Sequence, residues 1–254
     1  MKWMRFTHRG VAAFGVLEGD RVQTYAGDLF DAPIATGESV AIAEIAWMPP
    51  CVPGKIIGLW NNYRASAEKN GWTTPAAPLY FLKSPGSATG HLRPIAVPAS
   101  CGGRVVYEGE LAVVIGRRCR SVAVDEAAAA IFGYTCANDV TAIELLHSDP
   151  SFPQWTRAKS FDGFAAFGPV IDTAFDPATA TLRTIVGGRV RQDYPLSDMF
   201  FGPAELVAQI SRDMTLEAGD VIFCGTSLGV LPMKPGTTVE IVVDGIGTLS
   251  NVYG

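Results

Sequence analysis

This chain of 254 residues has few histidines, no long apolar run and no excess of basic charge. Its three histidines, His8, His91 and His147, do not stand at the spacings that zinc sites use. No apolar stretch reaches the roughly 18 residues of a membrane helix, and the first residues do not form the apolar segment of a signal peptide. We therefore expect neither a zinc site nor a membrane partner.

The charge balance, the cysteines and the glycines exclude further classes of protein. The net charge is −5, so no basic surface is available to neutralise the phosphates of a nucleic acid. The five cysteines are scattered and never form a C-x-x-C pair, which is typical of free thiols in a reducing cytoplasm. The glycines form no phosphate-binding loop. The sequence thus predicts a cytoplasmic protein that binds neither nucleic acid nor a nucleotide cofactor.

Three acidic residues stand among apolar neighbours. Glu108 and Glu110 alternate within the apolar run 105–115, and Asp139 follows the small apolar segment 133–137. Alternate residues of a strand share one face, so both glutamates would point the same way from a buried strand. Such acids usually mark a solvent-facing edge, but these neighbours are too apolar for one. Buried anions need a cation, and carboxylates without histidine favour a hard divalent ion such as Mg²⁺, Mn²⁺ or Ca²⁺.

Proline and glycine divide the chain near residue 50. The segment Met48–Gly54 contains three prolines and a glycine, and continues neither a sheet nor a helix. Before it, the segments Val11–Leu17 and Arg21–Tyr25 flank a Glu-Gly-Asp turn and predict a strand-turn-strand unit. We expect a small N-terminal β subdomain, residues 1–49, and a catalytic domain, residues 50–254.

The larger unit is predicted to consist mostly of short strands. Segments rich in apolar residues and punctuated by Gly and Pro predict strands at residues 55–59, 79–83, 105–115, 165–171, 183–190, 221–224 and 239–243. Acids in a first turn and a proline near a start predict helices at residues 124–131 and 203–212. These elements predict a mostly β protein of the α+β class.

Further motifs follow one another in order along the chain. They are YEGELAVVIG at 107–116, GYTCANDVTA at 133–142, AKSFD at 158–162, GP at 168–169, RQ at 191–192, SDM at 197–199, TLEAGDVI at 215–222 and GT at 225–226. Together they resemble the fumarylacetoacetate hydrolase superfamily, with its fumarylacetoacetase-like C-terminal domain, over roughly residues 55–254. The resemblance implies a mixed β-sandwich roll with a few short helices, usually as a homodimer. It also implies that Glu108, Glu110 and Asp139 bind Mg²⁺ or Mn²⁺.

The resemblance assigns roles to residues that would otherwise pass as structural. Lys159 corresponds to a lysine whose ammonium stabilises substrate oxygens beside the metal, where charge develops. Thr226 corresponds to a position whose hydroxyl, together with backbone amides around Gly225, holds a substrate carboxylate. Gln192 is a weaker candidate for substrate binding and is expected in a turn after the strand 183–190.

The segment 61–69 resembles a mobile lid but departs from the pattern of hydrolytic relatives. Those relatives carry N-Y-x-x-H-x-x-E, in which the His–Glu pair deprotonates water. This chain has Ser66 and Lys69 at the two positions, and a serine does not act as a base near neutral pH without help. Tyr63 and Arg64 remain candidates to close over the substrate.

A second departure follows the metal-binding aspartate. Many relatives have an arginine four residues and a glutamine seven residues after it, and both hold the substrate. Ile143 and Leu146 occupy these positions here, so the distal part of the substrate would be apolar or differently oriented. Glu144 and His147 are nearby replacements to consider, although a lone histidine in such a turn is more often structural.

These observations predict a metal-dependent enzyme that acts through a metal-stabilised enolate on a small 2-oxo carboxylate, of the acylpyruvate or fumarylpyruvate type. The breadth of the family favours hydrolysis of a C–C bond in the catabolism of aromatic compounds. The missing His–Glu pair favours the alternative, an isomerase, tautomerase or decarboxylase resembling 2-hydroxyhepta-2,4-diene-1,7-dioate isomerase or oxaloacetate tautomerase. A catalytically inactive binding protein is a third reading, which the three retained acids disfavour.

Overall fold

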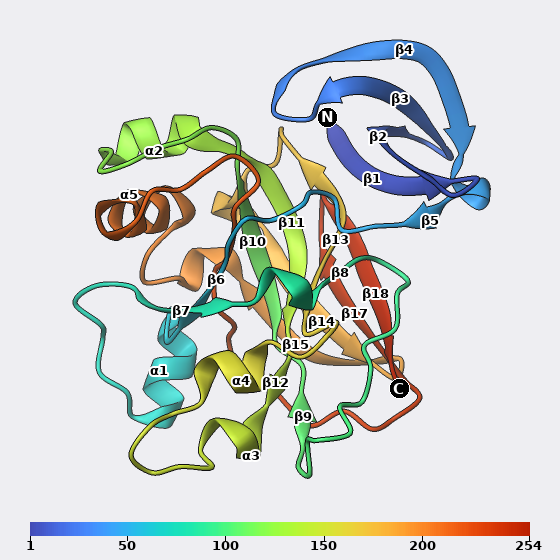
Figure 1. Cartoon of the computed structure of the whole chain (residues 1–254). Coiled ribbons are helices and arrows are strands. Elements are labelled where there is room, and N and C mark those ends of the chain that lie inside the picture. The colour runs from blue at the N-terminus through green and yellow to red at the C-terminus, as the bar shows by residue number, and fades with distance from the viewer.

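The computed structural model describes residues 1–254 and consists mostly of strands, as predicted (Figure 1). The strands are β1 (Lys2–His8), β2 (Val11–Glu18), β3 (Arg21–Asp28), β4 (Asp31–Ala41), β5 (Ala46–Trp47), β6 (Ile56–Trp60), β7 (Leu79–Lys83), β8 (Ala88–Thr89), β9 (Val105–Val106), β10 (Gly109–Ile115), β11 (Ile131–Asp139), β12 (Thr141–Ala142), β13 (Ala165–Asp172), β14 (Thr181–Val186), β15 (Arg189–Pro195), β16 (Val221–Phe223), β17 (Thr237–Val243) and β18 (Gly247–Tyr253). The α-helices are α1 (Arg64–Asn70), α2 (Val124–Ala130), α3 (Ile143–Leu146), α4 (Trp155–Lys159) and α5 (Pro203–Asp213). Both predicted helices are present, as α2 and α5. None of the helices combines the length and the apolar composition that crossing a bilayer requires.

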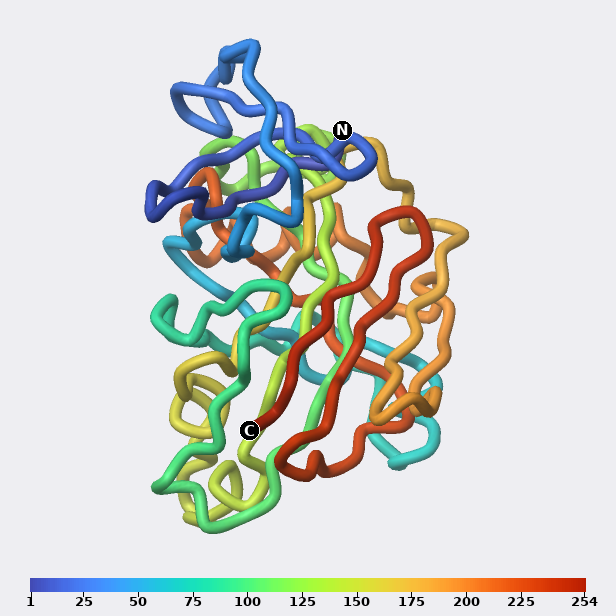
Figure 2. The backbone as a smooth tube through the Cα atoms, turned by 90° about the vertical axis from the view of Figure 1, so that its right-hand side faces the viewer, coloured from blue at the N-terminus to red at the C-terminus, as the bar shows by residue number.

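Two open sheets form a sandwich, which confirms the predicted fold class. The larger sheet has twelve strands in the order β4-β3-β2-β1-β13-β11-β10-β16-β6-β7, with β5 beside β1 and β8 beside β13. It is mixed, because β16 and β6 run parallel whereas most other pairs are antiparallel. The smaller sheet has the order β15-β14-β17-β18. It packs on β10, β11 and β13, and Figure 2 shows its β17–β18 hairpin, in red, lying over the large sheet.

The N-terminal strands extend one end of the large sheet. The predicted strand-turn-strand unit is present as β2 and β3, in which Phe14 pairs with Tyr25. β1 joins these strands to the rest, because Lys2 pairs with Asp172 of β13. The blue strands of Figure 1 therefore stand at one end of the molecule. The division at residues 49 and 50 stays a prediction, and so does the homodimer.

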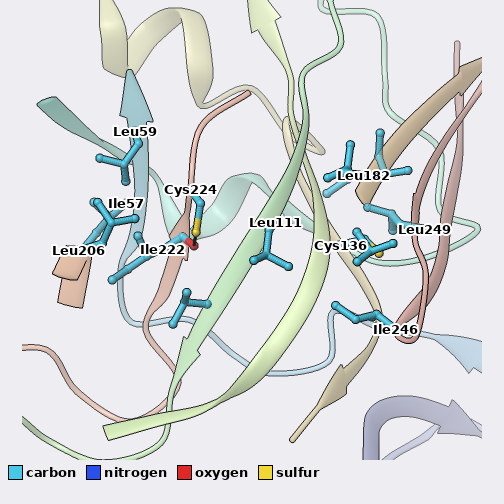
Figure 3. Packing of buried hydrophobic residues seen from close by; sticks show 14 of the residues in the cluster. Ile57, Leu59, Leu111, Cys136, Leu182, Leu206, Ile222, Cys224, Ile246 and Leu249 are labelled. Carbon is cyan, nitrogen blue, oxygen red and sulfur yellow. Dashed lines mark hydrogen bonds between the residues drawn. The ribbon is translucent and has the colours of Figure 1, made fainter. Parts of the chain in front are cut away.

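The strand β10 is buried at every position because both of its faces are covered. Leu111, Val113 and Ile115 belong to the larger apolar cluster, whereas Ala112 and Val114 belong to a smaller one. This alternation is the period of two that a strand imposes. Figure 3 shows Leu111 between Leu182 of the smaller sheet on one side and Leu206 of α5 on the other. A strand fixed on both faces is a rigid support for the acid that it carries.

Two of the predicted strands are interrupted. The segment 105–115 contains β9 and β10, and Glu108 lies between them outside any strand. The segment 183–190 is a hairpin, in which Gly187 and Gly188 turn the chain between β14 and β15. Both glycines have positive φ, the conformation that tight hairpin turns require.

Candidate active site

Three carboxylates from two parts of the chain meet at the large sheet. Glu110 lies in β10, Asp139 ends β11, and Glu108 precedes β10. One oxygen of each residue lies within 4.8 Å of the others. We call Glu108, Glu110 and Asp139 the carboxylate cluster. Glu110 and Asp139 are completely buried, and the side chain of Glu108 is 16% exposed.

Hydrogen bonds from the surrounding chain fix the two glutamates. The backbone N–H of Glu108 donates to the side-chain oxygen of Asn138 at 3.0 Å, and the hydroxyl of Thr141 donates to Oε1 of Glu108 at 2.8 Å. The backbone N–H of Gly225 donates to Oε2 of Glu110 at 2.6 Å. The other oxygen of Glu110, Oε1, is buried and has no hydrogen-bond partner. A buried oxygen without a partner is rare in native proteins and indicates a missing cation or donor.

Two lysines contact the cluster, and one of them, Lys159, is predicted from the sequence. Lys159, at the end of α4, donates to Oε2 of Glu108 and to Oδ2 of Asp139, each at 2.7 Å. Lys83, at the end of β7, donates to Oδ1 of Asp139 and, at 2.9 Å, to the carbonyl of Phe164. The side chain of Lys83 is completely buried. Its only signal in the sequence is a lysine closing a short apolar segment.

Burial and neighbouring charges act differently on the pKa of each group. Burial raises the pKa of Glu110 well above its ordinary value, and the charges of Asp139 and Glu108 raise it further. Burial would also raise the pKa of Asp139, but Lys159 and Lys83 outweigh it and lower that pKa. Burial would lower the pKa of Lys159, but Asp139 and Glu108 outweigh it and raise that pKa. Burial also outweighs Lys159 at Glu108 and raises its pKa, so of the three acids only Asp139 has its pKa lowered, and the pKa of Glu110 is raised the most clearly.

The residues present fit a hard divalent cation. The cluster carries three negative charges when ionised, and Lys159 and Lys83 supply two positive charges, which leaves one buried anion. Burying an uncompensated charge is costly. The donors are all oxygens, and Oε1 of Glu110 is free to bind. Mg²⁺ and Mn²⁺ prefer such ligands.

A cavity of about 560 Å³ opens beside the cluster, and Glu108 and Lys159 reach its wall. The apolar part of the wall consists of Leu59, Trp60, Trp72, Phe81, Ile143, Leu146, Trp155, Leu228 and Val230. The remaining residues of the wall are Asn61, Ser66, Lys69, Asn70, Thr141, His147, Thr226, Ser227 and Gly229. This volume is within the range of pockets that bind small molecules.

The lid segment contributes to this wall through α1. Ser66 and Lys69 both line the cavity, so the two positions that depart from the hydrolytic pattern face the site. Tyr63 and Arg64 do not line it. Tyr63 is completely buried, and Arg64 donates a hydrogen bond to the carbonyl of Met199. A role for these two residues in covering the substrate stays a prediction.

Some side chains of the segment after Asp139 line the cavity, and others lie at the surface. Ile143 and Leu146, which replace an arginine and a glutamine of many relatives, line the cavity, and so does His147. Glu144 does not line it and forms an ion pair with Arg104 at the surface. Of the two polar replacements considered from the sequence, the structure places only the histidine at the cavity.

Thr226 lines the cavity, but its hydroxyl is engaged within the protein. It donates to the carbonyl of Gly109 at 2.8 Å and accepts from Nε2 of Gln192 at 2.9 Å. Gln192 lies in β15 rather than in the expected turn, and its Oε1 accepts from the N–H of Gly109 at 2.9 Å and from the hydroxyl of Thr184 at 2.8 Å. Neither Gln192 nor Gly225 reaches the cavity wall. Gln192 thus links the loop of Thr226 to the backbone between the two glutamates.

Comparison with known proteins agrees with this geometry. Residues 55–252 match the sequence model described as fumarylacetoacetate (FAA) hydrolase C-terminal, and residues 1–50 match the one described as Rv2993c-like, N-terminal. The structure of 5-carboxymethyl-2-hydroxymuconate delta-isomerase from Mycobacterium smegmatis is 39% identical, with a TM-score of 0.92 over 100% of this chain and 99% of that chain.

Two further relatives bear names of other activities. Oxaloacetate tautomerase YisK from Bacillus subtilis is 34% identical over 94% of this chain and 85% of its own length. Maleylpyruvate hydrolase from Sphingobium sp. SYK-6, solved in complex with manganese(II) and pyruvate, is 27% identical with a TM-score of 0.81 over 100% of both chains. The match over residues 55–252 and these likenesses show that this chain is an enzyme of the fumarylacetoacetate hydrolase family.

Proposed function

We propose that this enzyme forms the enolate of a small 2-oxo carboxylate and moves a proton on it, as an isomerase or tautomerase that depends on Mg²⁺ or Mn²⁺. The observation that carries the proposal is the carboxylate cluster, with Lys159, at a cavity of about 560 Å³. A divalent cation held by the cluster would supply Lewis-acid stabilisation for an enolate. The relatives named as an isomerase and a tautomerase support this reaction class.

We assign Lys159 to the substrate oxygen on which negative charge develops. The side chain of Lys159 is 3% exposed and lies at the cavity wall. Asp139 and Glu108 raise the pKa of Lys159 despite its burial and keep the ammonium charged. The hydrogen bonds that the ammonium donates to these two carboxylates fix its position. A fixed charge in a water-poor site stabilises an oxyanion without reorganisation at the moment of reaction.

The residues of the lid favour proton transfer over attack by water. Hydrolysis requires a base that deprotonates water, and α1 presents Ser66 and Lys69 to the cavity in place of a His–Glu pair. Hydrolysis of the C–C bond of an acylpyruvate is the second candidate. The likeness to maleylpyruvate hydrolase favours it, and His147 at the wall would be the base that it needs.

The aromatic wall favours a substrate with an apolar distal part. Phe81 and Trp155 stack with ring centroids 4.9 Å apart, and Trp60 and Trp72 lie at the same separation. Apart from Lys159, Lys69 is the only lysine or arginine of the wall. A second carboxylate on the substrate could therefore form an ion pair with Lys69 alone.

Substrate conversion in isotopically labelled water tests the proposal. The purified protein is incubated in H₂¹⁸O with Mg²⁺ and, in parallel, with oxaloacetate and with acylpyruvates, and enol absorbance and products are followed. We expect Mg²⁺-dependent enol–keto conversion without cleavage. Appearance of ¹⁸O in a new carboxylate would establish hydrolysis instead, and release of CO₂ would establish decarboxylation. Equal conversion in the presence of a chelator would contradict the role of the cation.

A further inference from the structure

Two aromatic rings stand directly beside the carboxylate cluster. The ring of Phe81 lies over Gly58, because a Cβ at that position would meet the ring at 2.5 Å and would come within 3.3 Å of Oδ2 of Asp139. Trp155 stacks on Phe81, with the ring centroids 4.9 Å apart and the ring planes 17° from parallel. The missing side chain at Gly58 thus leaves room for an aromatic surface next to the acid that ends β11.

The same rings lie close to the ammonium that we assign to the substrate oxyanion. Nζ of Lys159 lies 5.1 Å from the centroid of the Phe81 ring. Trp155 precedes Lys159 by four residues in α4, and residues at that spacing share one face of a helix. A substrate whose oxyanion contacts Lys159 would therefore place the group on C3, the carbon next to the oxo carbon, against aromatic rings.

Two tryptophans extend this aromatic surface on either side of the lid. Trp60 and Trp72 flank the segment 61–71, and their ring centroids are 4.9 Å apart. Gly58 pairs with Phe81, and Trp60 follows two residues later in β6, so Trp60 and Phe81 project from the same face of the sheet. Trp60 and Trp72 are 36% and 39% exposed. An apolar ligand in the cavity would remove part of this aromatic surface from water.

The positions that could bind a second carboxylate are mostly apolar. Ile143 and Leu146 line the cavity where many relatives carry an arginine and a glutamine. Lys69 is the only lysine or arginine of the wall besides Lys159, and it is exposed to solvent. A dicarboxylate would leave the aromatic surface without a partner, whereas an aromatic ring would cover it.

We propose that the substrate is an arylpyruvate, a 2-oxo acid whose C3 carries an aromatic ring, and that Phe81, Trp155, Trp60 and Trp72 form its ring-binding subsite. This inference rests on the proposed function, because it names the substrate class for that same site. The enol and keto forms of such an acid differ in the position of one proton, which leaves the enol oxygen while a proton is added at C3, so the conversion needs no co-reactant. Contacts between aromatic rings favour a ring over an aliphatic group of similar area.

Three stable amides that share one chelating end test the substrate class. Oxamate consists of that end alone, N-phenyloxamate adds an aromatic ring, and N-oxalylglycine adds a second carboxylate. The binding of each is measured by calorimetry in the presence of Mg²⁺. Burial of the phenyl ring should make N-phenyloxamate bind about 10- to 100-fold more tightly than oxamate. N-oxalylglycine should bind within about fivefold of oxamate, because an ion pair with an exposed lysine contributes little.

Substitutions in the wall locate the ring-binding subsite. Phe81→Leu keeps an apolar side chain but removes a ring, and it should lower the preference for N-phenyloxamate over oxamate by about 2- to 10-fold. Ile143→Arg places a cation at the wall and should shift the preference toward N-oxalylglycine. Ile34→Arg, at an isoleucine of β4 that is 72% exposed, is the matched control and should keep the preference of the wild type.

The outcomes distinguish the substrate class from the proposed function. Equal binding of N-phenyloxamate and oxamate by the wild type, or a preference for N-oxalylglycine, would overturn the substrate class and leave the proposed function in place. Failure of all three amides to bind with Mg²⁺ would overturn the proposed function as well. A wild-type preference retained by both Phe81→Leu and Ile143→Arg would show that the ring binds elsewhere and would overturn the subsite.

Discussion

Replacing Glu110 by glutamine is expected to stabilise the metal-free protein, although it changes a completely buried residue. Oε2 of Glu110 accepts from the N–H of Gly225 at 2.6 Å, and Oε1 has no partner. A glutamine keeps an oxygen for Gly225 and places an NH₂ donor where the unpartnered oxygen lies. Relief of one unsatisfied buried group is worth about 1–3 kcal/mol, or roughly 2–12 °C in the melting temperature of a chain of this size.

The raised pKa of Glu110 also makes the stability of the wild type depend on pH. Burial, followed by the charges of Asp139 and Glu108, raises the pKa of Glu110 above its ordinary 4.5. Above that pH the folded state holds a proton that the unfolded state has released, so the free energy of unfolding falls as the pH rises from about 4.5. Glu110→Gln removes this contribution. Its advantage over the wild type should therefore be larger at pH 7 than at pH 5.

Thermal and urea unfolding in a chelator, from pH 5 to pH 8, measure this advantage. Glu38→Gln, which changes an exposed acid of β4, is the matched control and should follow the wild type. Added Mg²⁺ should raise the melting temperature of the wild type and of the control but leave Glu110→Gln unchanged. A Glu110→Gln variant that is less stable than the wild type at pH 7 in chelator would refute the reasoning, as would an undiminished response to Mg²⁺.

The lysines and the lid give three further predictions. Lys159→Met should destabilise the metal-free protein by about 3–5 kcal/mol in urea unfolding, because it breaks buried ion pairs. The variant should also show no turnover with Mg²⁺, and full turnover would remove Lys159 from the mechanism. Lys83→Met should cost a similar amount through Asp139, and a change below about 1 kcal/mol would show that this pair contributes little, as surface pairs do. The double variant Ser66→His with Lys69→Glu should gain hydrolysis of an acylpyruvate, measured by ¹⁸O incorporation, and no gain would mean that these positions do not direct water to the carbonyl.

The carboxylate cluster could be predicted from the sequence, but the position of Glu108 relative to the strand could not. The alternation of Glu108 and Glu110 suggested one strand with both acids on one face. In the structure Glu108 lies outside β10, and its direction is set by Thr141 and Asn138. The acids converge because tertiary hydrogen bonds orient one of them. The alternation of residues along one strand does not predict these tertiary hydrogen bonds.

Lys83 could not be recognised from local patterns. Lys83 contacts Asp139, which lies 56 residues further along the chain, and a strand-end lysine is ordinarily exposed. The hairpin of β14 and β15 is different, because Gly-Gly within the segment 183–190 is a recognised turn signal and could have divided the predicted strand.

Exchange of the methyl protons of pyruvate in D₂O, followed by nuclear magnetic resonance, is the most direct test of cation-dependent enolate formation by this enzyme. It reports formation of the enolate whatever reaction the natural substrate then undergoes. We expect the wild type with Mg²⁺ to replace these protons by deuterium, and we expect chelation or Glu110→Gln to reduce the rate to that of the solution without enzyme. Exchange at an equal rate in chelator, or no exchange by the wild type with Mg²⁺ or Mn²⁺, would contradict cation-dependent enolate formation.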